Sequence, residues 1–272
     1  MTIRISGKQA ALERLVSETG SALVAFSGGV DSTFLAAVAH DVLGDRAVAV
    51  TAVSPAVPAL EVEEARETAR VIGVRHLTVE TSEMESADYV RNTPDRCYHC
   101  KSHLFRRLRT MADEMGLAVI LEGSNVDDEG DFRPGRRAAF EHGVRAPLLE
   151  AGLSKEEIRG LSRERGLPTW DKPSMACLAS RIPYGTPISL GVLSQIEAAE
   201  GILRGLGLRQ LRVRHHGRTA RIEVDADGMS LLMQEEKRRL IVAGLKSLGY
   251  AYVTLDLAGF RSGSLNEGLG PP

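Results

Sequence analysis

The segment Ser27-Gly28-Gly29-Val30-Asp31-Ser32 restricts the possible folds of this chain more than any other part of its sequence. It follows the apolar residues 22–26, which are typical of a buried parallel strand. It precedes residues 33–39, whose composition indicates a helix. Small residues between a strand and a helix let backbone N–H groups point into one concavity, in front of the positive end of the helix dipole. The sequence therefore predicts a strand–turn–helix unit with an anion site at its turn.

The residue types of this turn suit a phosphate ligand. Gly28 and Gly29 leave room for a phosphate close to the backbone. Asp31 and Ser32 stand at the start of the helix, where their side chains can cap free amides or help to hold a cation. No G-x-x-x-x-G-K-[ST] pattern occurs in the chain, so the turn is not a Walker loop. The alternative interpretation is an ordinary glycine turn.

The six residues resemble the pyrophosphate loop of the N-type ATP pyrophosphatases, the superfamily of NAD synthetase, GMP synthetase and the tRNA-thiolating enzymes. This resemblance implies that ATP is cleaved between its α and β phosphates, that a substrate oxygen is adenylylated, and that a nucleophile then displaces AMP. Mg²⁺ would screen the leaving pyrophosphate, and Asp31 and Asp128 are its candidate ligands. The candidate ATP-binding residues are Ser27, Gly28, Gly29, Asp31, Ser32, Ser54 and Gly123.

Length and charge limit the classes of partner. The 272 residues can form one large or two small domains. A formal net charge of −2 does not favour a broad electrostatic grip on nucleic acid. No apolar stretch approaches the roughly 20 residues that span a bilayer, and the first residues lack the apolar core of a signal peptide. We therefore expect a cytoplasmic protein without a membrane partner, in which cysteines are ligands, reactive thiols or core residues rather than disulfides.

Strands and helices are predicted to alternate through the first part of the chain. Strands are expected at 22–26, 47–53, 76–79, 117–121 and 144–148, and helices at 8–18, 33–39, 59–72 and 98–115. Ser154 and Glu157 form a capping box that opens one more helix. This alternation predicts an α/β fold with a doubly wound parallel sheet of the adenine nucleotide α-hydrolase type. Ligands of such sheets bind at the carboxyl ends of the strands.

The pattern changes near residues 182–187, where two prolines and a glycine suggest a linker. Beyond it we expect helices at 189–206 and 228–248, and strands at 211–215, 220–224 and 251–255. The predicted organisation is therefore an ATP pyrophosphatase domain at 1–180, a linker at 181–188 and a small α+β domain at 189–264. Residues 265–272 are expected to be disordered.

Two of the three cysteines form the motif Cys97-Tyr98-His99-Cys100 at the start of a predicted helix. Both sulfurs of such a motif can reach one metal centre, and the helix amides favour the thiolate. A redox disulfide is an alternative, although no strand leads into the motif as a thioredoxin-like site requires. Zinc would need a fourth ligand such as His99, His103 or an exogenous group.

The third cysteine, Cys177, lies in a segment without helical or strand periodicity. A nearby Lys172 or Arg181 would favour its thiolate. Three cysteines can hold a [4Fe–4S] cluster and leave one iron open for a substrate or a sulfide. The alternative interpretation is that all three are buried core thiols, because free cysteine is commonly buried.

Four ordered segments resemble the LarE family of sulfur transferases: 122–128, 131–135, 173–181 and 255–264. Together they make the resemblance extend over nearly the whole chain. LarE enzymes act on pyridinium-3,5-biscarboxylic acid mononucleotide and build the nickel-pincer nucleotide cofactor of lactate racemase. The resemblance implies that ATP adenylylates a substrate carboxylate and that sulfur displaces AMP to leave a thiocarboxylate.

The family supplies sulfur in two ways. In one branch a single cysteine, which matches Cys177, gives up its own sulfur and becomes dehydroalanine. In the other branch this cysteine joins a C-x-x-C motif to hold a [4Fe–4S] cluster whose open iron carries a sulfide. Because Cys97, Cys100 and Cys177 are all present, the chain resembles the cluster branch. We expect these three residues to be catalytic and to ligate the cluster, and sacrificial donation from Cys177 stays open.

Other candidate residues lie in the last third of the chain. Arg212 and Arg214 are two positions apart on a predicted strand and therefore share one face, where a pair of guanidinium groups suits a phosphate. A solvated strand face is the alternative. The resemblance supports Arg212 and Arg214 as substrate-phosphate ligands and adds further candidate contacts. These are Ser180 and Arg181 for the substrate, with Glu200 and Glu223 near the substrate or a metal.

Several alternative functions share the pyrophosphate loop. A tRNA-thiolating enzyme would also use it, but would require a basic surface for RNA. An amide-forming ligase would not need three cysteines, and a module that senses ATP or AMP would bind without turnover. For the sulfur transferase, the expected partners are the pyridinium dicarboxylate mononucleotide and sulfide or another sulfur donor. The family resemblance also implies a homo-oligomer.

Overall fold

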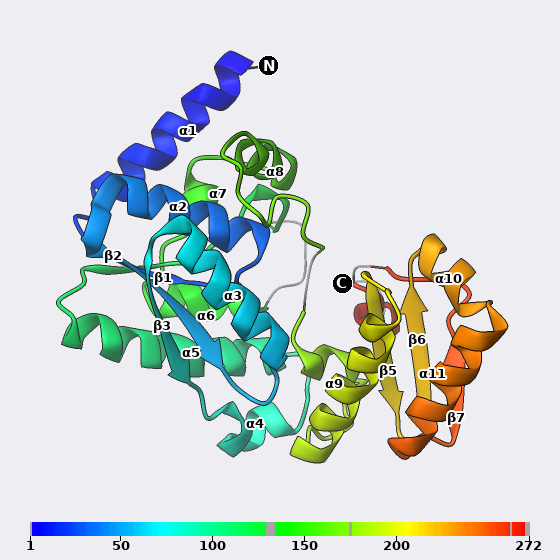
Figure 1. Ribbon diagram of the computed structural model, residues 1–272. Coiled ribbons are helices and arrows are strands. Elements are labelled where there is room, and N and C mark those ends of the chain that lie inside the picture. Colours follow the sequence, from blue (N-terminus) through cyan, green and yellow to red (C-terminus); the bar gives the residue numbers. More distant parts are fainter. Residues whose placement is uncertain (1, 129–133, 174–175, 262, 270–272) are drawn as a thin grey trace. The chain divides into compact units, whose positions relative to one another are not determined.

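The computed structural model describes residues 2–128, 134–173, 176–261 and 263–269. The chain divides into two compact units, one formed by Met1–Tyr89 with Pro94–Met175 and the other by Val90–Thr93 with Ala176–Pro272 (Figure 1). The predicted domain limits at 180 and 189 stay predictions. The structure adds that a short piece from the first half of the chain, Val90–Thr93, belongs to the second unit.

The first unit alternates helices and strands, as its sequence predicts. Its strands are β1 (Ala22–Ala25), β2 (Ala47–Val53), β3 (Arg75–Glu80) and β4 (Val119–Leu121). Its described α-helices are α1 (Thr2–Ser17), α2 (Val30–Leu43), α3 (Ala59–Ile72), α5 (Arg96–Glu114), α6 (Pro134–Glu141), α7 (Pro147–Glu150) and α8 (Lys155–Glu164), and α4 (Ala87–Val90) reaches the second unit. Short 3-10 turns are η1 (Gly44–Arg46), η2 (Glu83–Glu85) and η3 (Val126–Asp128).

The four described strands of this unit form a parallel sheet in the order β3-β2-β1-β4. From β1 the chain adds β2 and β3 on one side, then returns to place β4 on the other side. One core cluster joins α1, α2 and α8 to one face of the sheet, and a second joins α5 and α6 to the opposite face. Helices therefore cover both faces, which confirms the predicted α/β doubly wound architecture.

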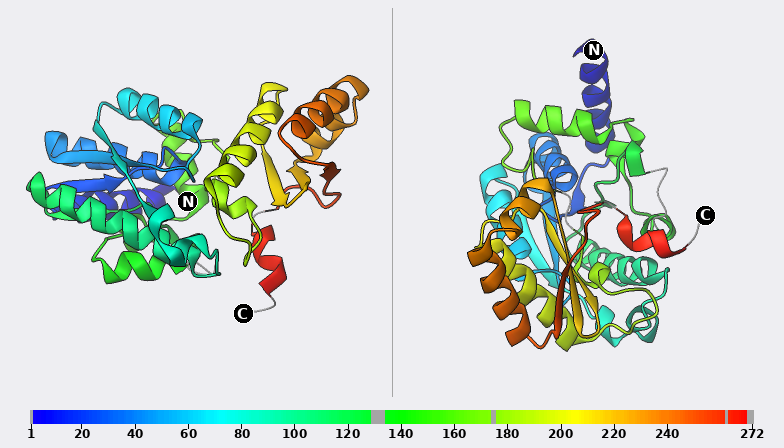
Figure 2. Two further views of the ribbon diagram at one scale, coloured as in Figure 1. Left: turned by 90° about the horizontal axis from the view of Figure 1, so that it is seen from below. Right: turned by 90° about the vertical axis from the view of Figure 1, so that its right-hand side faces the viewer.

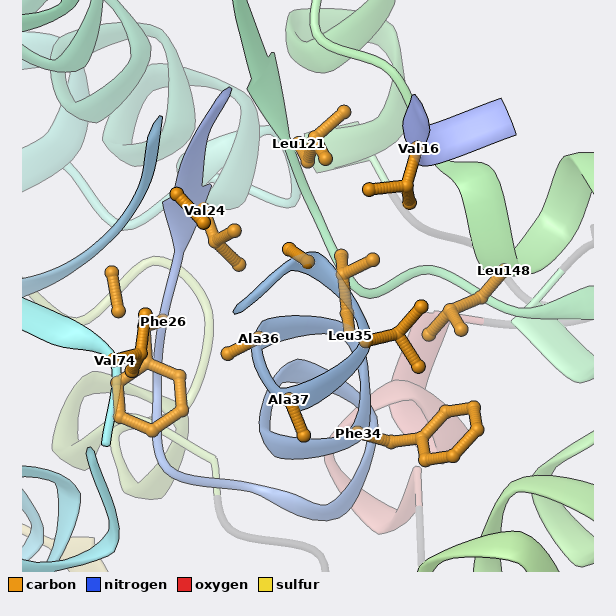
Figure 3. Packing of buried hydrophobic residues seen from close by; sticks show 14 of the residues in the cluster. Val16, Val24, Phe26, Phe34, Leu35, Ala36, Ala37, Val74, Leu121 and Leu148 are labelled. Carbon is orange, nitrogen blue, oxygen red and sulfur yellow. The ribbon is translucent and has the colours of Figure 1, made fainter. Parts of the chain in front are cut away.

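Helix α2 is the most deeply buried helix of the pyrophosphate-loop region. Phe34 and Leu35 are fully buried against Leu148 and the helices around them (Figure 3). Ala36 and Ala37, which are also buried, let the helix approach its neighbours closely. Burial of one large apolar side chain contributes roughly 1.5–3 kcal/mol, so packing fixes the start of α2.

The second unit is a three-stranded sheet covered by helices. It contains α9 (Leu190–Gly205), β5 (Leu211–His216), β6 (Thr219–Val224), α10 (Ala226–Leu232), α11 (Glu235–Ser247) and β7 (Tyr252–Leu255), with 3-10 turns η4 (Leu178–Arg181) and η5 (Ser264–Leu269). Strand β6 lies between an antiparallel β5 and a parallel β7. Within this unit, Figure 2 shows α10 and α11 on one side of the sheet and η5 on the other.

Two predicted elements differ from the structure. Residues 144–148 were predicted as a strand, but only a single bridge joins Arg145 to Leu121, because Pro147 starts the short helix α7. The predicted helix at 228–248 is instead two helices, α10 and α11. Asp225 caps α10 by accepting a hydrogen bond from Gly228 N at 2.8 Å, and a new helix begins at Glu235 with acidic residues in its first turn.

The described parts of the predicted linker and tail make contacts within the second unit. In the linker, Ile182 and Ile188 are buried, and the Asn92 side chain donates hydrogen bonds to the carbonyls of Pro183 and Thr186, each at 2.8 Å. In the predicted tail, residues 265–269 belong to η5, whose first residue, Ser264, is buried. Residues 270–272 lie outside the described residues. No helix in the described part of the chain is long and apolar enough to cross a membrane.

Candidate functional site

The pyrophosphate-loop residues lie where the central strand of the parallel sheet ends. Strand β1 ends at Ala25, two residues before Ser27. Its neighbours β2 and β4 end directly before Ser54 and shortly before Gly123. Because these strands are parallel, their carboxyl ends meet at one edge of the sheet. The predicted nucleotide residues therefore gather at the edge where such sheets bind ligands.

The loop itself is held by its two serines. Ser27 N donates to Ser32 Oγ at 3.2 Å, the two hydroxyl oxygens are 3.1 Å apart, and Ser32 Oγ donates to Gly29 O at 3.2 Å. Gly29 is the N-cap residue of α2 and has no side chain that could cover the first amides of the helix. The first turn of α2 consequently keeps the features of an anion site.

Glycine is required at two places around the loop. Gly28 has a φ of +66°, and a Cβ added there would lie 2.9 Å from both Cα and Cβ of Ala65 in α3. A Cβ at Gly123 would lie 3.0 Å from Ser32 N. Any side chain at Gly123 would therefore press on the start of α2. The close approach of these backbones explains why the loop and the segment after β4 both carry glycine.

We expect Gly28→Ala to lower the free energy of unfolding by about 2–4 kcal/mol, because left-handed strain adds to a backbone clash. Gly20→Ala is the matched control, since Gly20 has a φ of +68° but nothing within 4 Å of an added Cβ. The control isolates the conformational strain, which we expect to be about 1–2 kcal/mol. Urea unfolding of both variants measures the difference. Equal losses of stability would show that contact with Ala65 has no part in fixing the loop.

Two lysines not among the sequence-predicted ligands stand at the loop. Lys155 Nζ forms an ion pair with Asp31 Oδ2, and Asn125 Nδ2 donates to Asp31 Oδ1 at 3.3 Å. Lys172 Nζ donates to Gly28 O at 3.0 Å and is 2.8 Å from Glu64 Oε2. The sequence suggested Lys172 as a cation that could favour the Cys177 thiolate, and the structure adds contacts of its ammonium with the loop and with α3. Both lysines are far from the loop along the chain, so no local pattern marks them.

The acidic candidates of this unit serve as hydrogen-bond acceptors. Asp128 is buried, and its Oδ2 accepts from Asn125 N at 3.0 Å. Asp127 Oδ2 accepts from Lys155 N at 2.7 Å, which ties η3 to the start of α8. The Ser54 hydroxyl accepts from Ala56 N at 3.2 Å, just beyond β2. These contacts place Asp128 and Ser54 at the same sheet edge as the loop.

The C-x-x-C motif occupies the first turn of α5. Cys97 and Cys100 are half-buried and three positions apart, so they lie on one side of the helix. The backbone of α6 packs closely on this turn, because a Cβ at Gly135 would be 3.7 Å from Cys97 O. Within neither unit does the described part of the chain gather three or more His, Cys, Asp or Glu side chains as metal ligands. Cys177 belongs to the second unit.

Arg181 clamps the turn that carries Cys177. Its guanidinium donates from Nε and NH2 to Glu200 at 2.8 and 3.1 Å, and both side chains are almost completely buried. Its NH1 donates to the carbonyls of Ala176 and Cys177 and to Ser180 Oγ. Sequence reasoning expected Arg181 to contact the substrate. In the structure its donors hold the Cys177 turn and Glu200.

A second buried pair joins the two strands of the hairpin. Arg214 donates to both oxygens of Glu223 at 2.9 Å and to Ser180 O at 2.6 Å. Arg214 also donates to Ser264 Oγ at 2.6 Å, and Arg221 lies 3.0 Å from Glu223 Oε1. The oxygens of Glu223 are therefore shared among arginines and a hydroxyl, as those of Glu200 are shared among Arg181, Arg204 and Val213 N.

Arg212 is also buried, but its contacts are with an aromatic ring and a backbone carbonyl, whereas Arg181 and Arg214 each pair with a glutamate. It is 7% exposed, its guanidinium lies 4.5 Å from the Phe260 ring centroid, and NH1 donates to Arg261 O at 3.5 Å. Within the described part of the chain, no carboxylate forms an ion pair with it. Burial, followed by the like charges of Arg214 and Arg181, lowers the pKa of Arg212 to about 10. Arg212 and Arg214 lie two positions apart on β5 and therefore on one face of the strand, where Arg212 contacts Phe260 and Arg214 contacts Ser264.

We expect Arg212→Met to raise the free energy of unfolding by about 1–2 kcal/mol, because methionine keeps the apolar contact and removes a desolvated charge. The matched control is Arg209→Met, at an exposed arginine shortly before the same strand, where we expect a change within about 0.5 kcal/mol. Urea unfolding of the two variants measures the contrast. A loss of stability in the Arg212 variant would mean that the charge is better compensated than these contacts indicate.

A cavity of about 310 Å³ lies beside the buried arginines Arg181 and Arg214. Its lining includes Arg181, Arg214, Arg221, His216 and Tyr184. The pKa of His216 is lowered by desolvation and then by the nearby Arg221 and Arg214, while Glu223 acts in the opposite direction. Three arginines therefore line this cavity within the second unit.

The chain is similar in sequence to a known family and to several known proteins. The asparagine synthase family model matches residues 8–125, which include the loop and all four described strands of the parallel sheet. An uncharacterized protein of Synechocystis is 45% identical over 258 residues, covering 95% of this chain and 96% of that protein. A tRNA-specific 2-thiouridylase of Azorhizobium caulinodans is 29% identical over 188 residues, but covers only 56% of this chain and 48% of that enzyme.

The pyridinium-3,5-bisthiocarboxylic acid mononucleotide synthase of Lactiplantibacillus plantarum is 39% identical over 269 residues. The match covers 97% of this chain and 96% of the synthase, so it includes both units. This extent of similarity confirms the resemblance suggested by the four sequence segments. The chain belongs to the LarE family of pyridinium-3,5-bisthiocarboxylic acid mononucleotide synthases, within the larger group of pyrophosphate-loop enzymes.

Proposed function

We propose that this protein is an ATP-dependent sulfur transferase. It adenylylates a carboxylate of pyridinium-3,5-biscarboxylic acid mononucleotide and converts it to a thiocarboxylate for a nickel-pincer nucleotide cofactor. The observation that carries this proposal is the similarity, over nearly the full length of both chains, to the synthase of Lactiplantibacillus plantarum. The pyrophosphate-loop geometry in the first unit and the arginine-lined cavity in the second unit support it.

The first step is activation of the carboxylate. One carboxylate oxygen attacks the α-phosphorus of ATP, the bond from that phosphorus to the bridging oxygen breaks, and pyrophosphate leaves. Backbone amides at the start of α2 and the lysines at the loop would stabilise the charge on the phosphates. Mg²⁺, when bound, would neutralise phosphate charge, and Asp31 is positioned at the loop to contribute to its site.

The second step replaces the activated oxygen by sulfur. A sulfide attacks the acyl carbon, the bond from that carbon to the AMP oxygen breaks, and AMP leaves with the electron pair. We propose that Arg212 and Arg214, with Ser180, bind the phosphate of the mononucleotide. The support is a cavity beside Arg214 and a buried Arg212, which forms no ion pair with a carboxylate of the described residues and would gain an anionic partner.

The three cysteines suit a thiolate-bound cluster as donors. Cys97 and Cys100 present two half-buried sulfurs from one helical turn, and the half-buried Cys177 stands at the start of η4. We propose that the three ligate a [4Fe–4S] cluster, which when bound would supply sulfide from its open iron. Sacrificial donation from Cys177 is the alternative within the same function. Homo-oligomer formation belongs to the same proposal.

Product analysis tests the proposed function. The reconstituted protein is mixed with ATP, Mg²⁺, sulfide and the pyridinium dicarboxylate mononucleotide. AMP and pyrophosphate should form only when the dicarboxylate is present, and mass spectrometry should show one oxygen of the substrate replaced by sulfur. Omission of the dicarboxylate and its replacement by bulk tRNA are the controls. Thiolation of tRNA, or release of pyrophosphate that ignores the dicarboxylate, would overturn the proposal.

A further inference from the structure

Asn92 joins two segments of the second unit that are far apart in the sequence. It belongs to the short segment Val90–Thr93, and its Nδ2 donates to the carbonyl oxygens of Pro183 and Thr186, each at 2.8 Å. The backbones are paired as well, because Gly185 N donates to Asn92 O at 3.0 Å. Asn92 therefore holds a piece of the first half of the chain against the turn at residues 183–186.

Asn92 is buried and has an unusual backbone conformation. Its relative exposure is 0%, and with a φ of +55° it is the only non-glycine residue of the described chain that has a positive φ. Asparagine is one of the few residue types that tolerate this conformation. Residues in such sparsely populated conformations persist where their surroundings determine them, and they concentrate at functional sites. The position is therefore a candidate for a role beyond packing.

Both segments lead directly to cysteines. Cys97 follows Asn92 by five positions, and Pro94, whose ring fixes its φ, stiffens the piece between them. Cys177 precedes Pro183 by six positions, and most of η4, which lies between them, is buried. Pieces of five or six residues span at most roughly 18–22 Å. The contacts of Asn92 thus join the two cysteine-bearing segments through short tethers.

We propose that Asn92 is a positioning residue for sulfur transfer, which keeps the segment that enters the C-x-x-C helix on the segment that follows Cys177. Thiols that ligate one cluster would come from distant parts of the sequence, and a fixed connection lowers the entropy lost when they converge. The inference rests on the proposed function and assigns no substrate contact to Asn92. It requires that Cys100 and Cys177 stay within reach of each other in protein without metal.

Thiol bridging in the metal-free full chain tests this requirement. Dibromobimane becomes fluorescent when it joins two thiols, and in Cys97→Ser it can join only Cys100 and Cys177. We expect the bridge to form in this parent. Asn92→Gly in the same background should lower its yield roughly ten-fold or more, because a longer effective tether lowers the concentration of one thiol near the other. Glycine accepts the positive φ, so the substitution removes the side-chain bonds without backbone strain.

Asn266→Gly is the matched control, because Asn266 Oδ1 accepts from Tyr184 OH at 3.1 Å and so contacts the same turn from η5. Its bridge yield should stay within about two-fold of the parent. Asn92→Asp keeps the size of the side chain but loses the donor, and should repeat the loss seen with glycine. A parent that forms no bridge, or an unchanged yield in a folded Asn92 variant, would overturn the proposal.

Iron binding gives a second readout with all three cysteines present. Asn92→Gly should hold less iron per chain after reconstitution, with weaker cluster absorbance, while ATP binding by the first unit stays within about two-fold. The bridging assay needs neither ATP nor the pyridinium substrate. If the unmodified protein bridges through Asn92 but never thiolates the mononucleotide, the proposed function fails and the role of Asn92 stands. If it thiolates while bridging ignores Asn92, only the present inference fails.

Discussion

Glu200→Ala is expected to lower the free energy of unfolding of the second unit by about 3–5 kcal/mol, because it leaves buried Arg181 without its carboxylate. Glu200 is completely buried and accepts from Arg181, from Arg204 at 3.1 Å and from Val213 N at 3.1 Å. Removing it therefore also leaves a buried backbone amide without an acceptor. Urea unfolding, followed by a probe in the second unit, measures the loss.

A second substitution separates the charge effect from general loss of packing. If the unpaired charge is the cause, Glu200→Leu combined with Arg181→Met should recover a large part of the stability lost in Glu200→Ala. Glu236→Gln is the matched surface control, since Glu236 is exposed at the start of α11 and should change stability by less than about 0.5 kcal/mol. If the double variant is as unstable as Glu200→Ala, the stability is lost through packing and not through the unpaired charge.

The same double variant examines the link to Cys177. Arg181 also donates to the carbonyls of Ala176 and Cys177, so it positions the turn as well as pairing with Glu200. A double variant that folds but no longer clamps the turn should retain ATP binding and lose sulfur transfer by roughly ten- to a hundred-fold. This division between the two activities is what a positioning role predicts.

Local patterns predicted most of the first unit. The apolar run before Ser27, the glycines of the loop and the helix after it are all within a few residues of each other, so their structure depends on short-range physics. The capping box at Ser154 and Glu157 forms as predicted, with Glu157 N donating to Ser154 Oγ at 3.2 Å. By contrast, the break between α10 and α11 depends on the cap at Asp225 and on packing around Gly228, where a Cβ would lie 2.8 Å from Val224 Cβ.

The partners of the charged residues were harder to predict because they are distant along the chain. Lys155 is 124 positions from Asp31, and Lys172 is 144 positions from Gly28. The position of Glu223 among its arginine partners could have been predicted from the sequence. The hairpin places Glu223 opposite Arg212 and next to Arg214, a register that a two-residue turn at Gly217 and Arg218 would have indicated. Sequence reasoning assigned Glu223 to a metal or substrate region and so missed its arginine partners.

Replacing Cys177 by serine is expected to reduce thiocarboxylate formation by roughly a thousand-fold or more, since both sulfur sources in the proposal depend on this thiol. Release of pyrophosphate and formation of the acyl adenylate should continue for a single turnover, because Cys177 belongs to the second unit and the loop to the first. AMP should then stay bound to the substrate carboxylate. Equal loss of both activities would indicate a folding defect. Far-ultraviolet circular dichroism and ATP binding of the variant distinguish that case.

Cys97→Ser and Cys100→Ser then separate the two sources of sulfur. If the three thiols ligate one cluster, protein reconstituted without oxygen should contain about four iron atoms per chain, and each single serine variant should lose both iron and repeated turnover with sulfide. If Cys177 donates its own sulfur, the Cys97 and Cys100 variants should still thiolate once per chain. Cys177 would then lose the mass of H₂S, in protein without iron. The Cys97 and Cys100 variants thus give opposite results under the two mechanisms, whereas the Cys177 variant is inactive under both.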